Sequence, residues 1–156
     1  TYADRMNAVE TLIILISLVA LSTVLGLVWR ARTGRIQRIT GTGEIPGSTI
    51  SIPGAPTFGS RVTLLQFSTE VCAPCKVTKT LLSGLASELD GGAGEINYVD
   101  IDVTSRPDLA NRFNLLQSPT VFILDGSGML RARIGGTPKI TDVQAEIERI
   151  LIPVLR

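Results

Sequence analysis

The sequence predicts an α/β domain in which a mixed central sheet is flanked by helices, preceded by one N-terminal transmembrane helix. Two observations predict this architecture. Residues 11–29 are apolar and uncharged, and from residue 62 strand patterns alternate with helical patterns before a hairpin and a last helix. Such an order is typical of a right-handed parallel crossover followed by an antiparallel pair. The length of 156 residues suits one globular domain with an appendage.

The segment 11–29 matches the roughly 20 apolar residues that cross a bilayer core. A cleaved signal peptide is the alternative, but the apolar stretch exceeds the roughly 7 to 15 residues of a signal core, and no convincing small-residue cleavage site follows it. We therefore expect an N-terminal tail over 1–10 and a retained single span over 11–29, with Trp29 at the membrane interface.

Arginines are concentrated on one side of this span. Four follow it, at positions 30, 32, 35 and 38, whereas Arg5 precedes it. The positive-inside rule then predicts that the C-terminal part lies on the cytoplasmic side of the cell membrane. An outward-facing domain whose arginines contact lipid headgroups is the alternative.

Residues 30–60 are rich in glycine and proline and contain few large apolar side chains. We expect a linker here which, if flexible, has an r.m.s. reach of roughly 30 Å. Within it, Ile45, Ile50 and Ile52 could form a short edge strand. The folded domain should occupy 61–156.

The folded domain begins with the apolar run 62–67, which is typical of a strand buried on both faces. A helix should begin near Cys72 or Ala73 and stop at Gly91 and Gly92. Its apolar stripe is formed by Val77, Leu81, Leu85 and Leu89.

The second half of the domain should contain a strand over 96–102 and a short helix over 107–114 that has proline at its start. Strands over 120–124 and 129–134 should form a hairpin around a D-G-S-G turn. The last helix has an apolar stripe formed by Ile140, Val143, Ile147 and Leu151.

Composition excludes several classes of function. The net charge is +1 and no basic run with interleaved aromatic residues occurs, so nucleic acid is not an expected partner. The sequence contains no histidine, which excludes histidine-dependent catalysis and histidine–metal sites. Two cysteines are too few for a structural disulfide framework.

These two cysteines, Cys72 and Cys75, stand in the stretch E-V-C-A-P-C-K. The first strand should end near Ser68, so Cys72 should lie at the N-terminus of the following helix, where backbone N–H groups and the helix dipole stabilise a thiolate. Cys75 lies one turn later and can reach Cys72, while Pro74 fits the first turn. The pattern favours dithiol–disulfide exchange, with Cys72 as the nucleophile and Cys75 as the resolving thiol.

Two other interpretations of the pair remain. A mononuclear zinc or iron–sulfur site needs about four ligands, and this sequence offers only two thiols, so a metal would have to be shared between two chains. Two inert core cysteines are the other alternative. We expect no metal and no cofactor.

Three features make residues 62–151 resemble the thioredoxin superfamily. C-A-P-C is one residue from the C-G-P-C of thioredoxins, S-P-T stands where that family has its cis-proline loop, and I-G-G follows the hairpin. The resemblance implies a thioredoxin-like fold, a cis Pro119 beside the cysteines, and a substrate groove. We expect this groove to be lined by Val71, Ala73, Pro74, Ser118, Pro119, Thr120 and Gly135.

The sequence departs from the thioredoxin pattern at two positions. Val71 stands where thioredoxins have tryptophan, and Gln66 occupies the position of the buried aspartate that relays a proton to the second cysteine. A neutral amide cannot act as that base, so Cys75 would need water or another group. The family's opening strand and helix are also absent or degenerate.

These features together predict a membrane-tethered thiol–disulfide oxidoreductase that exchanges its CXXC dithiol or disulfide with protein substrates. Its expected partners are protein disulfides or dithiols, an upstream redox partner and the membrane. The alternative is an accessory thioredoxin-like subunit of a membrane complex with a mainly structural role, in which small residues of the span contact other subunits.

Overall fold

The computed structural model describes residues 2–38, residue 52 and residues 57–152. The chain divides into two compact units, Thr1–Thr33 and Gly34–Arg156. Each unit has its own architecture, so the N-terminal helix and the folded domain are described separately.

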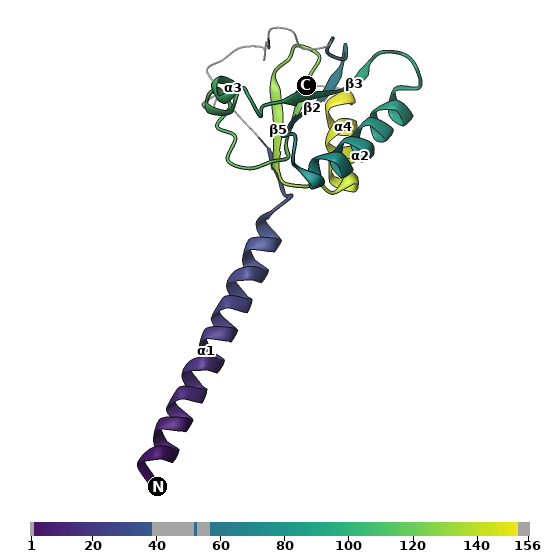
Figure 1. Cartoon of the computed structure of the whole chain (residues 1–156). Helices are drawn as coiled ribbons and strands as arrows, with labels where there is room; N and C mark the ends of the chain where they lie inside the picture. The colour runs from purple at the N-terminus through teal and green to yellow at the C-terminus, as the bar shows by residue number, and fades with distance from the viewer. Residues whose placement is uncertain (1, 39–51, 53–56, 153–156) are drawn as a thin grey trace. The chain divides into compact units, whose positions relative to one another are not determined.

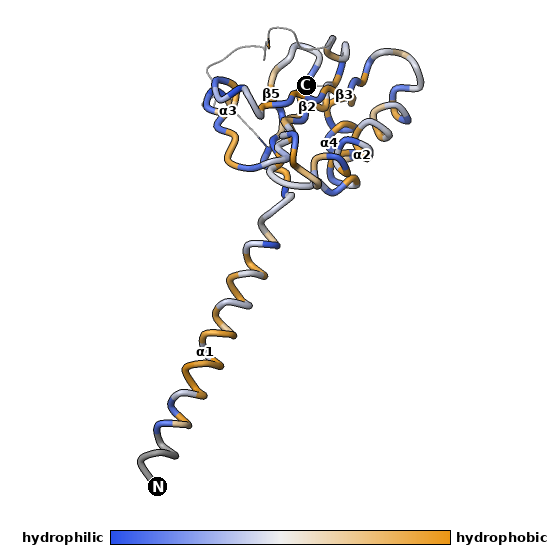
Figure 2. Tube along the Cα trace, viewed as in Figure 1, coloured by the Kyte–Doolittle hydropathy of each residue, from blue (hydrophilic) through white to orange (hydrophobic). Residues whose placement is uncertain are grey.

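The first unit is one long helix, α1 (Tyr2–Arg32). It contains an apolar segment, Asn7–Ala31, with a mean hydropathy of 2.6, which is long and apolar enough to cross a membrane. Figure 2 shows that apolar residues predominate along it. The hydroxyl groups of Thr11 and Thr23 donate to carbonyl oxygens one turn earlier, which satisfies them within the helix. The helix includes the expected span 11–29 and continues beyond both of its ends.

The second unit is built on a five-stranded sheet in the order β1-β5-β4-β2-β3 (Figure 1). The strands are β1 (Ile36–Arg38), β2 (Val62–Ser68), β3 (Ile96–Asp102), β4 (Thr120–Asp125) and β5 (Leu130–Gly135). Strand β2 is parallel to β3 and antiparallel to β4, and β4 is antiparallel to β5. The expected mixed sheet, with a parallel crossover followed by a hairpin, is confirmed.

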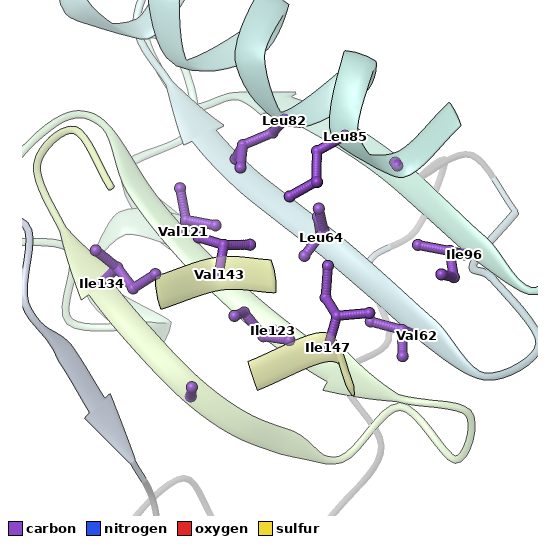
Figure 3. Packing of buried hydrophobic residues seen from close by; sticks show 12 residues of the cluster. Val62, Leu64, Leu82, Leu85, Ile96, Val121, Ile123, Ile134, Val143 and Ile147 are labelled. Carbon is purple, nitrogen blue, oxygen red and sulfur yellow. The ribbon is translucent and has the colours of Figure 1, made fainter. Parts of the chain in front are cut away.

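Three helices cover the sheet: α2 (Ala73–Asp90), α3 (Pro107–Arg112) and α4 (Ile140–Leu151). Because side chains alternate along a strand, Leu64 faces the core shared with α2 and α4, whereas Leu65 faces the core that includes α3. Figure 3 shows Leu82 of α2 and Ile147 of α4 reaching the first face. On the opposite face, three phenylalanine rings pack with centroids 5.1 to 5.9 Å apart, those of Phe67, Phe113 and Phe122.

The buried face of α2 differs from the stripe expected from its sequence. Val77 and Leu81 are 56% and 41% exposed. Positions four residues apart drift by about 40° around a helix, so a long i, i+4 stripe leaves the buried face at one end. The buried residues of α2 are Cys75, Thr78, Leu82, Leu85 and Ala86.

Strand β1 lies within the segment 30–60, which the sequence predicts to be a linker. It pairs antiparallel with β5, with Ile36 opposite Ile134 and Arg38 opposite Ala132. Ile52 is buried in the core beside α3. Residues 39–51 and 53–56 lie outside the described residues, and so do Ile45 and Ile50, so the edge strand expected there is untested. The boundary between linker and domain stays a prediction.

Candidate active site

The cysteine pair lies where β2 leads into α2. Cys72 is the N-cap residue of α2, with an extended backbone, and the backbone N–H of Cys75 donates to the Cys72 Sγ at 3.1 Å. Pro74 lies in the first turn, where its missing N–H leaves no helical hydrogen bond unmade. The two cysteines form a disulfide with their Cα atoms 5.3 Å apart.

The two cysteines differ in how deeply they are buried. Cys75 is only 3% exposed, whereas Cys72 is half-buried. The neighbouring Val71 is 94% exposed, and Ala73 and Pro74 are exposed as well. Cys72 is therefore the cysteine that a second molecule can approach, and small or apolar residues surround it.

The sheet register brings the second part of the expected site to the same edge. Phe67, near the end of β2, is opposite Thr120 at the start of β4, and Thr120 is opposite Gly135 at the end of β5. The Ser118–Pro119 peptide bond is cis, as the resemblance implies. The Gly136 N–H donates to the Pro119 carbonyl oxygen at 2.7 Å, which fixes the β4 and β5 ends together.

Thr120 and Gly135 are covered by a residue that the sequence did not indicate. The Thr120 hydroxyl is buried and donates to the Gln117 carbonyl oxygen at 2.7 Å. The Gln117 side-chain amide nitrogen lies 2.0 Å from where a Cβ at Gly135 would stand. Gln117 therefore occupies the space where a side chain at position 135 would stand.

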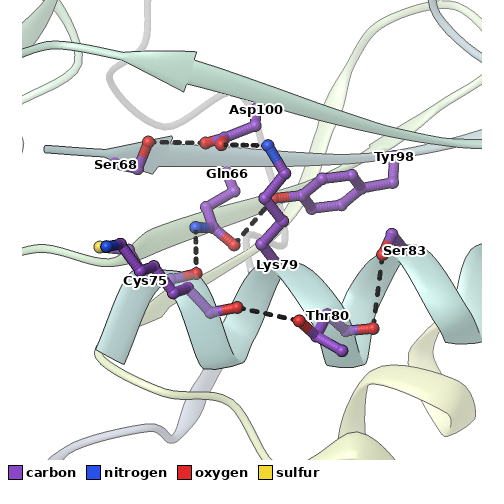
Figure 4. Close-up of polar contacts among 9 residues, drawn as sticks. Gln66, Ser68, Cys75, Lys79, Thr80, Ser83, Tyr98 and Asp100 are labelled. Atoms are coloured by element: carbon purple, nitrogen blue, oxygen red, sulfur yellow. Dashed lines mark hydrogen bonds and ion pairs between the residues drawn. The ribbon is translucent and has the colours of Figure 1, made fainter. Parts of the chain in front are cut away.

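Gln66 lies beneath the cysteines and is fully buried. Its Nε2 donates to the Cys75 carbonyl oxygen at 3.0 Å, and its Oε1 accepts from the Tyr98 hydroxyl at 3.1 Å (Figure 4). Both ends of the amide are thus satisfied by neutral groups. Burial raises the pKa of Tyr98, and the negative charge of Asp100 raises it further. This hydroxyl therefore stays protonated across the physiological range.

The nearest acid in this network is Asp100, which is paired with Gln66 across the β2–β3 ladder. Its carboxylate accepts from the Ser68 hydroxyl at 2.7 Å and from the Lys79 ammonium at 3.3 Å (Figure 4). Tyr98 and Asp100 were missed from the sequence because only the strand register places them beside Gln66.

The thioredoxin family model matches residues 55–149. This match covers strands β2 to β5, helices α2 and α3, most of α4, the cysteine pair and the cis-proline turn.

The chain belongs to the thioredoxin family. Its domain is a thioredoxin-family thiol–disulfide oxidoreductase whose CXXC active site is the pair Cys72 and Cys75.

Individual thioredoxins are distant relatives of this chain. Thioredoxin M4, chloroplastic, of Arabidopsis thaliana is 30% identical over 89 residues, which are 57% of this chain but 44% of that protein. A thioredoxin of Staphylococcus saprophyticus is 31% identical over 80 residues, 51% of this chain and 74% of that one. The crystal structure of a chloroplastic thioredoxin z aligns with a TM-score of 0.51 at 26% identity, covering 59% of this chain and 80% of its own.

Within the thioredoxin domain, no group of three or more aspartate, glutamate or cysteine residues suited to a metal occurs among the residues that the structure describes. Both thiols are engaged in the disulfide.

Proposed function

We propose that this chain is a membrane-tethered thioredoxin-like oxidoreductase that reduces protein disulfides from the cytoplasmic side of the membrane. The observation that carries the proposal is the Cys72–Cys75 disulfide at the start of α2, with the Cys75 N–H directed at the Cys72 sulfur. The same N–H donates to a Cys72 thiolate once the disulfide is reduced, and the positive end of α2 adds to this stabilisation.

The reaction proceeds in two exchanges. The Cys72 thiolate attacks one sulfur of a substrate disulfide, so a Cys72–substrate disulfide forms and the other substrate sulfur leaves as a thiolate that takes a proton. Cys75, after losing its proton, then attacks the Cys72 sulfur, which forms the Cys72–Cys75 disulfide and releases the second substrate thiol. Two electrons and two protons pass to the substrate.

An upstream dithiol reductant must return these two electrons and two protons for the next cycle. Thioredoxins are recycled in this way by a reductase, and we propose that this chain also depends on a redox partner.

The amide of Gln66 leaves Cys75 without a base at the position where thioredoxins have an aspartate. The amide holds the Cys75 carbonyl and the Tyr98 hydroxyl but cannot accept a proton. Asp100, the neighbouring acid, is already bonded to Ser68 and Lys79. We therefore assign deprotonation of Cys75 to water, and Gln66 to the positioning of the helix start that carries both cysteines.

The substrate groove proposed from the sequence is supported by the register that places Thr120, next to the buried Pro119, and Gly135 at the same edge of the sheet as the end of β2. Val71, Ala73 and Pro74 form its outer rim on one side, since all three are exposed. A small valine replaces the tryptophan of the thioredoxin pattern at this rim, which leaves more room above Cys72.

The proposed tether is α1, and the arginines that follow its apolar segment favour the cytoplasmic side for the domain. A signal sequence has the same apolar character. Labelling intact cells with an impermeant maleimide, after reduction, distinguishes the two sides, because a cytoplasmic Cys72 is labelled only once the cells are permeabilised.

Insulin reduction tests the activity. The full chain in detergent, with excess dithiothreitol as the reductant, should accelerate the reduction, while Cys72→Ser should fall to the rate of dithiothreitol alone. Parent-like activity of Cys72→Ser would contradict the proposal. A stoichiometric membrane partner that still co-purifies with the Cys72→Ser/Cys75→Ser variant, together with an inactive parent, would favour the accessory-subunit function instead.

A further inference from the structure

The chain enters the folded domain at the edge of the sheet that carries the active site. The Gly34 N–H donates to the Gly135 carbonyl oxygen at 2.8 Å, and Gly135 is the groove residue at the end of β5. Gly34 has a φ of +79°, and a Cβ there would lie 2.5 Å from the Thr137 carbonyl oxygen. Only glycine can make this close approach without moving backbone, so the entry point is sterically defined.

Strand β1 then fastens the entering chain to the domain. Ile36 pairs with Ile134 and packs against the core shared with α2 and α4. At the other end of the strand, the Arg38 Nε donates to the Glu146 Oε2 at 2.9 Å. Glu146 is fully buried on α4 and also binds Arg149. We call the Arg38–Glu146–Arg149 group the β1 clamp.

Most of the glycine- and proline-rich stretch comes after β1 in the sequence. It consequently does not separate the apolar helix from the first strand of the domain. Described residues of the domain lie on both sides of it: Arg38 pairs in β1, Ile52 is buried in the second core, and the Thr57 carbonyl oxygen accepts from Asn97 at 2.6 Å. Both of its ends belong to the folded domain. The connection that sets the reach of the domain is the two-residue step from Arg32, the last residue of α1, to Gly34.

A step of two residues extends at most about 7 Å, whatever direction α1 takes. From β1 to β2 the sheet adds three strand spacings of about 4.8 Å, or about 14 Å, before Cys72 is reached. The domain is therefore joined to α1 by a step of two residues, and not by a flexible linker with an r.m.s. reach of roughly 30 Å.

We propose that the substrates of this site are disulfides in the membrane-proximal segments of membrane proteins, in preference to disulfides carried far from the bilayer. This inference rests on the membrane tether and the reductase activity proposed above. The rim of the site suits such segments, because Val71 and Leu116, close in sequence to Cys72 and Pro119, are 94% and 83% exposed and offer apolar surface to an apolar stretch of chain.

Reconstitution of the full chain in phosphatidylcholine vesicles tests the preference. The probes are two single-span peptides with the same disulfide-closed loop, placed either about five residues from the span or behind a Gly/Ser spacer of about 60 residues, which has an r.m.s. length of about 40 Å. The near disulfide should be reduced about tenfold faster than the distant one, because its effective concentration at Cys72 is higher.

Two insertion variants provide the matched comparison. A Gly/Ser segment of about 20 residues placed between Thr33 and Gly34 lengthens the tether by an r.m.s. distance of about 25 Å and should reduce the preference to about twofold or less. The same segment placed between Gly41 and Thr42 follows β1 in the sequence, so it does not lengthen the connection between α1 and Gly34 and should leave the preference unchanged. Insulin reduction by each variant reports that the domain is folded.

The outcomes separate this inference from the proposed function. Equal rates on the two peptides by a parent that reduces both would overturn the membrane-proximal preference while leaving the reductase activity standing. So would insertions that change the preference equally at both sites, or an insertion after Thr33 that leaves it intact. A parent that reduces neither peptide nor insulin would instead overturn the proposed function, and the inference with it.

Discussion

Gln66 and Tyr98 form a buried polar pair directly under the active-site cysteines. Gln66 satisfies the Cys75 carbonyl with one end of its amide and the Tyr98 hydroxyl with the other. A carboxylate at this position would carry a charge into the core, where burial disfavours ionisation. The amide gives up a proton-accepting group but keeps the start of α2 hydrogen-bonded to β2.

Removing both side chains should destabilise the protein by less than the losses from the two single substitutions added together. Gln66→Leu removes the side-chain donor to the Cys75 carbonyl and the acceptor of the Tyr98 hydroxyl, and should destabilise the full chain in detergent by about 1 to 3 kcal/mol. Tyr98→Phe should cost about 1 kcal/mol, and the double variant should fall short of the sum by about 0.5 kcal/mol or more. Urea denaturation measures all three, and strict additivity would mean that the two side chains do not interact.

Some residues of the site could be predicted from the sequence and others could not. Cys72, Cys75 and Pro119 lie in short motifs that are visible in one dimension. Tyr98 and Asp100 do not, because their place beside Gln66 depends on the register between β2 and β3. Gln117 was missed for a similar reason, since its side chain is brought to Gly135 by the pairing of β4 with β5.

At the level of helices and strands, the β1 clamp, which joins β1 to α4, depends on pH. Burial opposes ionisation of Glu146, but the hydrogen bonds and charges of Arg149 and Arg38 outweigh it and hold the pKa of this carboxyl below its usual range. A lowered pKa in the folded state means that the contribution to stability is present above the unfolded pKa, about 4.3 for glutamate. The contribution is lost as the pH falls through the lowered value.

Glu146→Gln should remove this pH-dependent contribution. At pH 7 the variant should be less stable than the parent by about 1 to 3 kcal/mol, and the difference should shrink below about pH 4. Comparing the two proteins in urea from pH 7 to pH 3 cancels the other carboxylates whose pKa values are lowered, such as Asp125 and Asp90. A difference that stays constant or grows in acid would contradict the assigned role of Glu146.

The apolar side chains that α2 buries differ from the stripe that its sequence predicts. Leu82 is fully buried, while Val77 on the same helix is 56% exposed. Leu82→Ala should therefore lower the free energy of unfolding by about 2 to 5 kcal/mol, whereas Val77→Ala should change it by no more than about 0.5 kcal/mol. Similar losses from the two substitutions, measured by urea denaturation, would mean that α2 is rotated relative to the sheet described above.

The order of the elements was foreseeable because each has a strong local pattern, such as the buried run of β2 and the apolar stripe of α4. Strand β1 has only three residues, one of them apolar, and its partner β5 lies about a hundred positions away. Nothing local marks Ile36–Arg38 as a strand. The glycine and proline residues that follow it made the whole stretch resemble a linker.

For the molecule as a whole, the position of β1 changes how the apolar helix relates to the chemistry. The chain enters the domain at Gly34, whose N–H donates to the Gly135 carbonyl oxygen, and Gly34 lies only two residues after the end of α1. In the proposed function, this short connection limits the range over which the oxidoreductase can act.

Trapping of the mixed disulfide tests the assignment of Cys72 and Cys75 most directly. The reduced full chain carrying Cys75→Ser, mixed with a disulfide-closed peptide, should accumulate a covalent Cys72–peptide adduct that mass spectrometry detects and dithiothreitol releases. The parent should show the adduct only transiently, and Cys72→Ser should show none. An adduct on Cys75 in the Cys72→Ser variant at a comparable rate, or no adduct with Cys75→Ser, would contradict the assigned roles of nucleophile and resolving thiol.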